Sequence, residues 1–170
     1  NITFIGEAAF CATKLPETLN LEKVESIGTN AFYGCTIKTV NAPKLTKLEK
    51  NAFSNCSVLT TLNAPELCEV GEQAFYKCTY FKTLNAPKIE KIGDNAFSLT
   101  AIEEFEVFEA LTELGTGAFD GCAKFTGFYA MVDGEKVTLT NGKYTIGALD
   151  SDKTVTVQKI IERQILTVTK

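Results

Sequence analysis

The 170-residue chain contains no histidine and no tryptophan, and only one methionine. Without histidine, Ser-His-Asp and Cys-His catalysis and all histidine-containing metal sites are excluded. Glycine-rich phosphate loops and the G-x-S-x-G nucleophile turn are also missing. We therefore expect no catalytic residues of these classes, no histidine-containing metal site and no cofactor.

Two further absences limit the partners. No apolar run approaches the roughly 20 residues of a membrane-spanning helix, so we expect no membrane insertion within these residues. The net charge is −4, and nucleic-acid binding needs a basic surface. We therefore expect no nucleic-acid partner.

What the chain does contain is an internal repeat. The dipeptide Ala-Phe occurs six times in steps of 21 or 22 residues, with its phenylalanines at Phe10, Phe32, Phe53, Phe75, Phe97 and Phe119. An aliphatic residue stands five and eight positions before each of them. A unit of this length has too few apolar residues to close its own core, so it must stack on its neighbours. The repeat predicts a rod of about six coils over residues 1–128, each with short parallel strands and a tight turn that directs Ala-Phe inward.

One coil shows the repeat most fully. It reads Leu59-x-x-Leu62-x-Ala-Pro65-x-Leu67-x-x-Val70-Gly71-x-x-Ala74-Phe75-x-x-Cys78, which resembles the BspA-like leucine-rich repeat of bacterial surface proteins. The resemblance implies a curved leucine-rich-repeat solenoid, β-rich, with short parallel strands and tight or 3-10 turns. It also implies a cell-surface or secreted location and contact with a host or bacterial surface protein or glycan, without catalysis.

The pattern changes after Phe128. Asp133-Gly134 and Asn141-Gly142 are dipeptides favoured in tight hairpins. They separate β-prone runs at Lys136–Thr140, Lys143–Ile146, Thr154–Gln158 and Ile165–Thr169. We expect a small antiparallel β module over residues 129–170. It is either a cap over the last coil or part of a separate, immunoglobulin-like module.

Polar residues recur in two columns beside the first apolar strand of each coil. One holds Thr39, Thr61, Thr83 and Glu104, and the other holds Asn41, Asn63, Asn85, Glu106 and Tyr129. Alternation along a strand directs both columns outward, and the resemblance places them on the concave sheet. They are either a structural surface, with amides bonded from coil to coil, or a site for protein or glycan. A binding site corresponds to an adhesion module, and a structural surface corresponds to a passive spacer that presents another domain. A carbohydrate-active enzyme is a remote alternative.

The fifth repeat departs from the others. It carries Glu103, Glu104, Glu106 and Glu109 where other coils have Thr, Lys and Asn, and it lacks the Pro and Cys of the pattern. These carboxylates form either a solvated acidic patch or a Ca²⁺ site.

Three other columns have structural interpretations. Cys35, Cys56, Cys78 and Cys122 share one position, for which we expect buried thiols without disulfides. Charges on the second strand alternate in sign between coils, as at Lys47, Glu69 and Lys91, which favours the correct register. A glycine near each turn is replaced once, by Glu49, so the position needs either a positive φ or only an ordinary dihedral.

Overall fold

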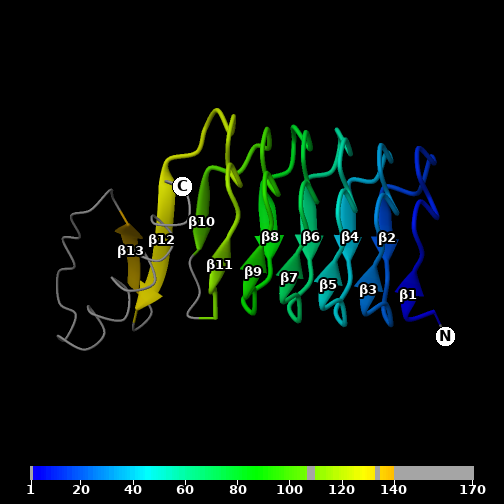
Figure 1. The fold of residues 1–170 in the computed structure, drawn as a ribbon, viewed down its shortest axis with the longest axis horizontal. Helices are drawn as coiled ribbons and strands as arrows, with labels where there is room; N and C mark the ends of the chain where they lie inside the picture. Colours follow the sequence, from blue (N-terminus) through cyan, green and yellow to red (C-terminus); the bar gives the residue numbers. More distant parts are fainter. Residues whose placement is uncertain (1, 107–109, 133–134, 140–170) are drawn as a thin grey trace.

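The computed structural model describes residues 2–106, 110–132 and 135–139 and places them in a rod of stacked coils (Figure 1). Its described elements are all β-strands. A six-stranded parallel sheet, the long sheet, runs the length of the rod in the order β1 (Phe4–Ile5), β3 (Ser26–Ile27), β5 (Lys47–Leu48), β7 (Glu69–Val70), β9 (Lys91–Ile92) and β11 (Glu113–Leu114). The described part of the chain contains no helix long and apolar enough to cross a membrane.

The other side of each coil supplies a second strand. A four-stranded parallel sheet, the Thr/Asn sheet, contains β2 (Thr18–Asn20), β4 (Thr39–Asn41), β6 (Thr61–Asn63) and β8 (Thr83–Asn85). A separate three-stranded sheet contains β10 (Glu104–Glu106), β12 (Gly127–Val132) and β13 (Glu135–Leu139). The predicted parallel solenoid is therefore confirmed, but one of its two sheets is interrupted.

The six Ala-Phe phenylalanines lie one above another inside the rod. Their ring centroids are 5.1–5.7 Å apart from coil to coil, and the rings are nearly parallel. Phe32, Phe53, Phe75 and Phe97 are wholly buried. Such offset stacks contribute beyond the burial of apolar area, and the predicted merging of the apolar columns is confirmed.

Tight turns on both sides of Ala-Phe produce this inward placement. In the first four coils three backbone bonds between residues three apart form the turn; in the second coil the Ala31 amide donates to the Gly28 carbonyl, Tyr33 to Asn30 and Cys35 to Phe32. Two positions per turn adopt a positive φ, and asparagine occupies four of them: Asn30, Asn51, Asn55 and Asn95. Asparagine tolerates this left-handed region better than most residues, which explains its recurrence there.

A positive φ does not explain why glycine recurs in the column that contains Gly71 and Gly93. Its members are not among the positive-φ residues, so the ordinary-dihedral alternative is correct and Glu49 is tolerated there. At Gly71, Gly93 and Gly115 a side chain has no room because the backbones of adjacent coils approach closely. A Cβ on Gly71 would lie 2.6 Å from the carbonyl carbon of Glu49, and one on Gly93 would lie 2.5 Å from the amide nitrogen of Glu72.

The cysteine column is buried as predicted. Cys56 and Cys78 are fully buried, and all six cysteines are free thiols. Each thiol of the column donates to the carbonyl of a phenylalanine in the preceding coil, at 2.8–3.1 Å, as Cys56 does to Phe32 and Cys78 to Phe53. Burial raises the pKa of the Cys78 thiol well above its ordinary value, which keeps it protonated as a donor.

Ion pairs on the long sheet follow the predicted alternation of charge. Lys47 contacts Glu69 at 3.5 Å, and Lys91 contacts Glu113 at 2.8 Å. A second row pairs Lys88 with Glu66 at 2.6 Å. These side chains are exposed, so each pair stabilises the fold by only about 0–1 kcal/mol and mainly favours the correct register.

The C-terminal hairpin continues the last coil. β12 pairs in parallel with β10 and antiparallel with β13, so the expected boundary between residues 128 and 129 falls within one strand. The expected strand Lys136–Thr140 corresponds to β13. The expected strands Lys143–Ile146, Thr154–Gln158 and Ile165–Thr169 lie outside the described residues.

Candidate functional site

The structure aligns the predicted polar columns along the Thr/Asn sheet. Thr39, Thr61 and Thr83 are partners in register, as are Asn41, Asn63 and Asn85. Their side chains are exposed or half-buried, whereas the intervening Val40 and Leu62 are wholly buried. We call the resulting outer surface the Thr/Asn face.

Asparagine side chains on this face bond to one another. The Asn41 Nδ2 donates to the Asn20 Oδ1 at 2.8 Å, and the Asn63 Nδ2 donates to the Asn41 Oδ1 at 2.7 Å. The predicted coil-to-coil amide bonding is therefore present in the first three strands. In that region the amides stabilise the stack, and fewer of their hydrogen-bonding groups are free for a partner.

The remaining predicted site residues lie on the second sheet. Glu104 pairs in register with Gly127, and Glu106 pairs with Tyr129. Glu104 and Glu106 do not continue the ladder of Thr83 and Asn85, because β8 and β10 belong to different sheets. The expectation of one unbroken polar face through the fifth repeat is corrected here.

The interruption has clear ends. We number each coil from its Ala-Phe phenylalanine, so that coil 4 begins at Phe75 and coil 5 at Phe97. Coils 4 and 5 are bonded before the interruption, where the Ala101 amide donates to the Phe81 carbonyl at 2.9 Å, and after it, where the Thr112 amide donates to the Glu90 carbonyl at 2.8 Å. Between these points, β8 has no strand partner on its β10 side among the described residues. We call this opening, bounded by residues 82–86 and 103–106, the split.

Burial gives independent evidence of the split. The inner strands β4 and β6 have a wholly buried central residue with half-buried neighbours. In β8, Thr83 and Asn85 are exposed and Leu84 is only half-buried, which is the pattern of β2 at the end of the rod. β8 is therefore an edge strand located in the middle of the solenoid.

Two adjoining cavities occupy the split. One, of about 210 Å³, has a floor that includes Leu84, Ile102 and Phe105. The other, of about 410 Å³, is lined by Lys82, Thr83, Glu103, Glu104 and Tyr129. Four of the predicted site residues therefore meet at the split: Thr83, Glu104, Glu106 and Tyr129.

Ion pairs define the electrostatics of this opening. Lys136 of β13 forms an ion pair with Glu104 and lies 4.5 Å above the ring of Tyr129. Lys124 lies 3.8 Å from Glu103. The Tyr129 hydroxyl donates to Glu106 at 3.4 Å, and burial, followed by the charge of Glu106, raises the tyrosine pKa. Two of the three glutamates at the split are thus paired with cations of this chain, Glu103 with Lys124 and Glu104 with Lys136.

The same acidic residues do not form a metal centre. Among the residues that the structure describes, no group of three or more histidine, cysteine or carboxylate side chains is arranged to hold a metal ion. Glu109 lies outside the described residues, so the expected four-carboxylate cluster is represented here by Glu103, Glu104 and Glu106.

The split was missed from sequence, although a spacing signal exists. In coil 5, Phe105 lies eight positions after Phe97, and Leu111 lies six positions after Phe105. In coil 4, Leu84 lies nine positions after Phe75, and Ile89 lies five positions after Leu84. Coil 2 also has the short first interval, yet β4 pairs normally on both sides. The distinguishing feature of coil 5 is therefore the extra residue after its strand, where Asn-Ala-Pro is also absent.

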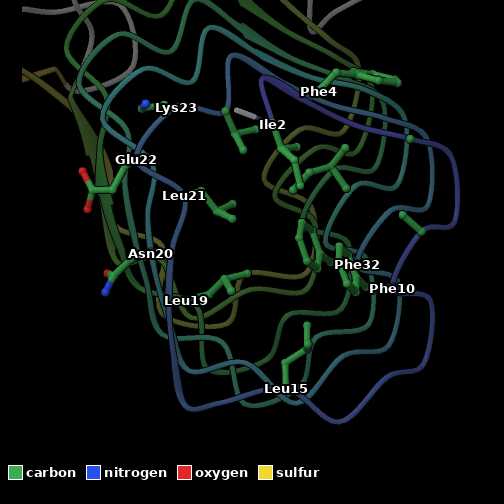
Figure 2. A pocket seen from close by; sticks show the side chains of 14 residues that line it. Ile2, Phe4, Phe10, Leu15, Leu19, Asn20, Leu21, Glu22, Lys23 and Phe32 are labelled. Atoms are coloured by element: carbon green, nitrogen blue, oxygen red, sulfur yellow. The ribbon is translucent and has the colours of Figure 1, made fainter.

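A third cavity lies at the N-terminal end of the rod. It measures about 430 Å³, and Figure 2 shows Leu19 and Leu21 pointing into the interior while Asn20 and Glu22 point away. Phe10, at the end of the ring stack, is 38% exposed, whereas Phe32 in the next coil is 0% exposed. The cavity thus lies over the first layer of the core in this chain and is lined mainly by apolar residues of the repeat.

Comparisons with known proteins agree with this architecture. A family model described as BspA type leucine rich repeat region matches residues 3–126 in six copies. The fold is similar to a leucine-rich cell surface protein of Faecalibacterium prausnitzii, with 23% identity, a TM-score of 0.54, and coverage of 82% of this chain and 47% of that one. No curated protein sequence matches the chain.

Two other solved structures are similar. A leucine-rich repeat protein of Bacteroides ovatus shares 26% identity with a TM-score of 0.61, covering 66% of this chain and 33% of that one. The pneumococcal vaccine antigen PcpA shares 20% identity with a TM-score of 0.63, covering 81% and 40%. This chain thus spans less than half the length of each of these three proteins. With its repeat columns, parallel coils and family match in agreement, the chain belongs to the BspA-type leucine-rich-repeat family.

Proposed function

We propose that this chain is a non-enzymatic binding module of a bacterial cell-surface or secreted protein, and that it contacts a protein or glycan through the Thr/Asn face and the split. The observation that supports this most is the edge-like exposure of β8 next to the two cavities. Hydrogen-bonding side chains, an apolar floor and charged groups meet there, a combination typical of binding sites.

The similar proteins add a second argument. One is described as a cell surface protein and another as a vaccine antigen, and both descriptions fit an exposed location. Extended solenoid surfaces are commonly used for binding. The binding surface would extend from the half-buried threonines of β4 and β6 to Tyr129 of β12.

A specific observation favours the alternative of a passive spacer. The Asn20, Asn41 and Asn63 amides satisfy one another, and the long sheet is reinforced by ion pairs along its length. A rod with these features holds another domain at a fixed distance without binding anything itself.

A binding screen separates the two functions. The intact chain is applied to arrays of host matrix proteins, bacterial surface proteins and glycans, beside a variant combining Thr83→Ala, Asn85→Ala and Glu104→Gln. The matched control combines Ser26→Ala, Lys47→Gln and Glu113→Gln on the long sheet. A binding module loses its signal in the first variant and keeps it in the control, whereas a spacer gives no signal with any of the three proteins.

A further inference from the structure

We propose, building on the binding function above, that the split captures an extended peptide segment of a protein partner and that this segment carries an arginine or lysine side chain. The proposal commits to β-strand addition at β8. It rests on three features of the split: backbone groups with no described partner, an apolar floor and one carboxylate, Glu106, with no described cationic partner.

The free backbone groups follow from the parallel ladder. The Thr83 amide donates to Thr60 in the preceding coil. In a parallel ladder alternate residues bond to opposite sides, so the Leu84 amide and carbonyl face the split. By the same alternation the Ala86 amide also faces the split. Its counterpart one coil earlier is bonded, since the Ala64 amide donates to the Asn85 carbonyl at 2.9 Å, whereas the Ala86 amide has no described hydrogen-bond partner.

The backbone groups of β10, on the opposite side of the split, alternate in direction in the same way. The Glu103 carbonyl accepts from the Thr126 amide at 2.7 Å, toward β12. The backbone groups of Glu104 and Glu106 therefore face the split. An extended peptide presents donors and acceptors in this same alternating order, which is why exposed strand edges recruit strands from other chains.

Natural proteins usually protect such edges. The edge strand here is short, and Lys82 lies beside it at the cavity wall. These features limit indiscriminate pairing, but within the part of the chain that the structure describes no strand pairs with this edge. The half-buried Leu84, together with Ile102 and Phe105, forms an apolar floor that an alternating peptide would cover with one of its side chains.

Charge indicates which peptide fits. Three carboxylates, Glu103, Glu104 and Glu106, border the split beside Lys82, and Lys124 and Lys136 pair with the first two. The described partner of Glu106 is the Tyr129 hydroxyl, a neutral donor at 3.4 Å. A guanidinium or ammonium group at Glu106 would add a charge-assisted bond. The chain already places Lys136 over the Tyr129 ring, so the site is compatible with a cation.

Nuclear magnetic resonance on the intact ¹⁵N-labelled chain tests the proposal. The probe is a pool of capped pentapeptides with arginine at the centre and mixed Thr, Val, Ile and Ser at the other positions. A matched pool has citrulline at the centre, which keeps the shape but removes the charge, and a third pool has N-methylated backbone amides. Glu106→Gln tests the carboxylate, and Glu113→Gln on the long sheet is the matched control variant.

The expected result is that the Leu84 and Ala86 amides shift and become protected from exchange, with the arginine pool binding at least about tenfold more tightly than the citrulline pool. The N-methylated pool loses binding. Glu106→Gln removes most of the preference for arginine, and Glu113→Gln preserves it.

Three outcomes would overturn the proposal. Shifts confined to Thr39, Thr61 and their neighbours would retain the binding function but exclude the split as its site. Equal shifts at Thr18 and Asn20, whose backbone groups form the N-terminal edge, would indicate unselective edge pairing. No shift at Leu84 and Ala86 with any pool would exclude peptide capture there, and the array screen above would then decide on the binding function separately.

Discussion

The two faces of the rod share the same coils but differ in continuity. The long sheet runs unbroken from β1 to β11 with strands of two residues, whereas the Thr/Asn sheet has longer strands and stops at β8. Strand length therefore does not decide which sheet is continuous. Coils 4 and 5 stay stacked because Phe75 packs on Phe97 and β9 pairs with β11. On the other face, β8 and β10 are not paired. Core packing can therefore hold two coils together where the strands of one face are separate.

The local sequence explains how this is possible. Coil 5 has one residue fewer than coil 4 before its strand and one more after it, so Phe97, Leu111 and Leu114 stay in their columns and are buried. The shift affects only the segment between them. A repeat protein can thus open one face at a single coil without disturbing the register of the other.

The largest expected effect comes from removing the core packing at the split. Phe97 stacks at 5.3 Å on both Phe75 and Phe119 and is wholly buried. Phe97→Ala should lower the free energy of unfolding by about 3–5 kcal/mol, measured by urea denaturation. Phe97→Leu, which keeps most of the apolar volume, should cost clearly less. A loss from Phe97→Ala below about 1 kcal/mol would show that the ring stack does not hold the coils together.

The unbroken face can be disturbed by a single methyl group. A Cβ on Gly93 would lie 2.5 Å from the Glu72 amide nitrogen and 2.8 Å from the Gly71 carbonyl carbon. Gly93→Ala should therefore destabilise the protein by about 1–3 kcal/mol in thermal or urea unfolding. Gly6→Ala is the control, because its nearest contact would be a Phe4 ring carbon at 3.8 Å. Equal effects of the two substitutions would contradict the close approach of the coils.

Repairing coil 5 should convert the broken face into a continuous one. Replacing residues 106–110 with Asn-Ala-Pro-Lys, the sequence that follows Leu84, removes the extra residue. Several new backbone bonds, each contributing about 0.5–1.5 kcal/mol, should raise the free energy of unfolding by roughly 1–3 kcal/mol. Amide exchange at Leu84 should slow in parallel. Glu106→Asn alone, which keeps the length, should leave the exchange unchanged, and if it closed the split, spacing would not be the cause.

The smallest effect is expected for the exposed ion pairs in and beside the long sheet. Lys88 contacts Glu66 at 2.6 Å, but both side chains are exposed. Lys88→Met should change the free energy of unfolding by only about 0–1 kcal/mol, and the difference should shrink at high salt. A larger, salt-independent loss would mean that these pairs stabilise the long sheet more than its core does.

Much of this comparison could be predicted from the sequence. The spacing of Ala-Phe predicts the ring stack, strand alternation predicts the outward asparagines, and the alternating Lys47, Glu69 and Lys91 predict the register of charges. These features depend on a period that the sequence itself displays. The role of Gly93 could not be predicted, because it depends on the distance between backbones of different coils. The split was also missed, because its signal is two compensating one-residue changes that leave the overall period intact.

Amide hydrogen exchange at Ala86 and Ala64 tests the central claim most directly. The two alanines occupy the same position in adjacent coils and are both buried, but the Ala64 amide donates to the Asn85 carbonyl and the Ala86 amide faces the split. In the intact chain under native conditions, we predict that Ala86 exchanges about tenfold or more faster than Ala64. Equal protection of the two amides would show that β8 and β10 are paired, and the interior edge strand with its proposed ligand would then be excluded.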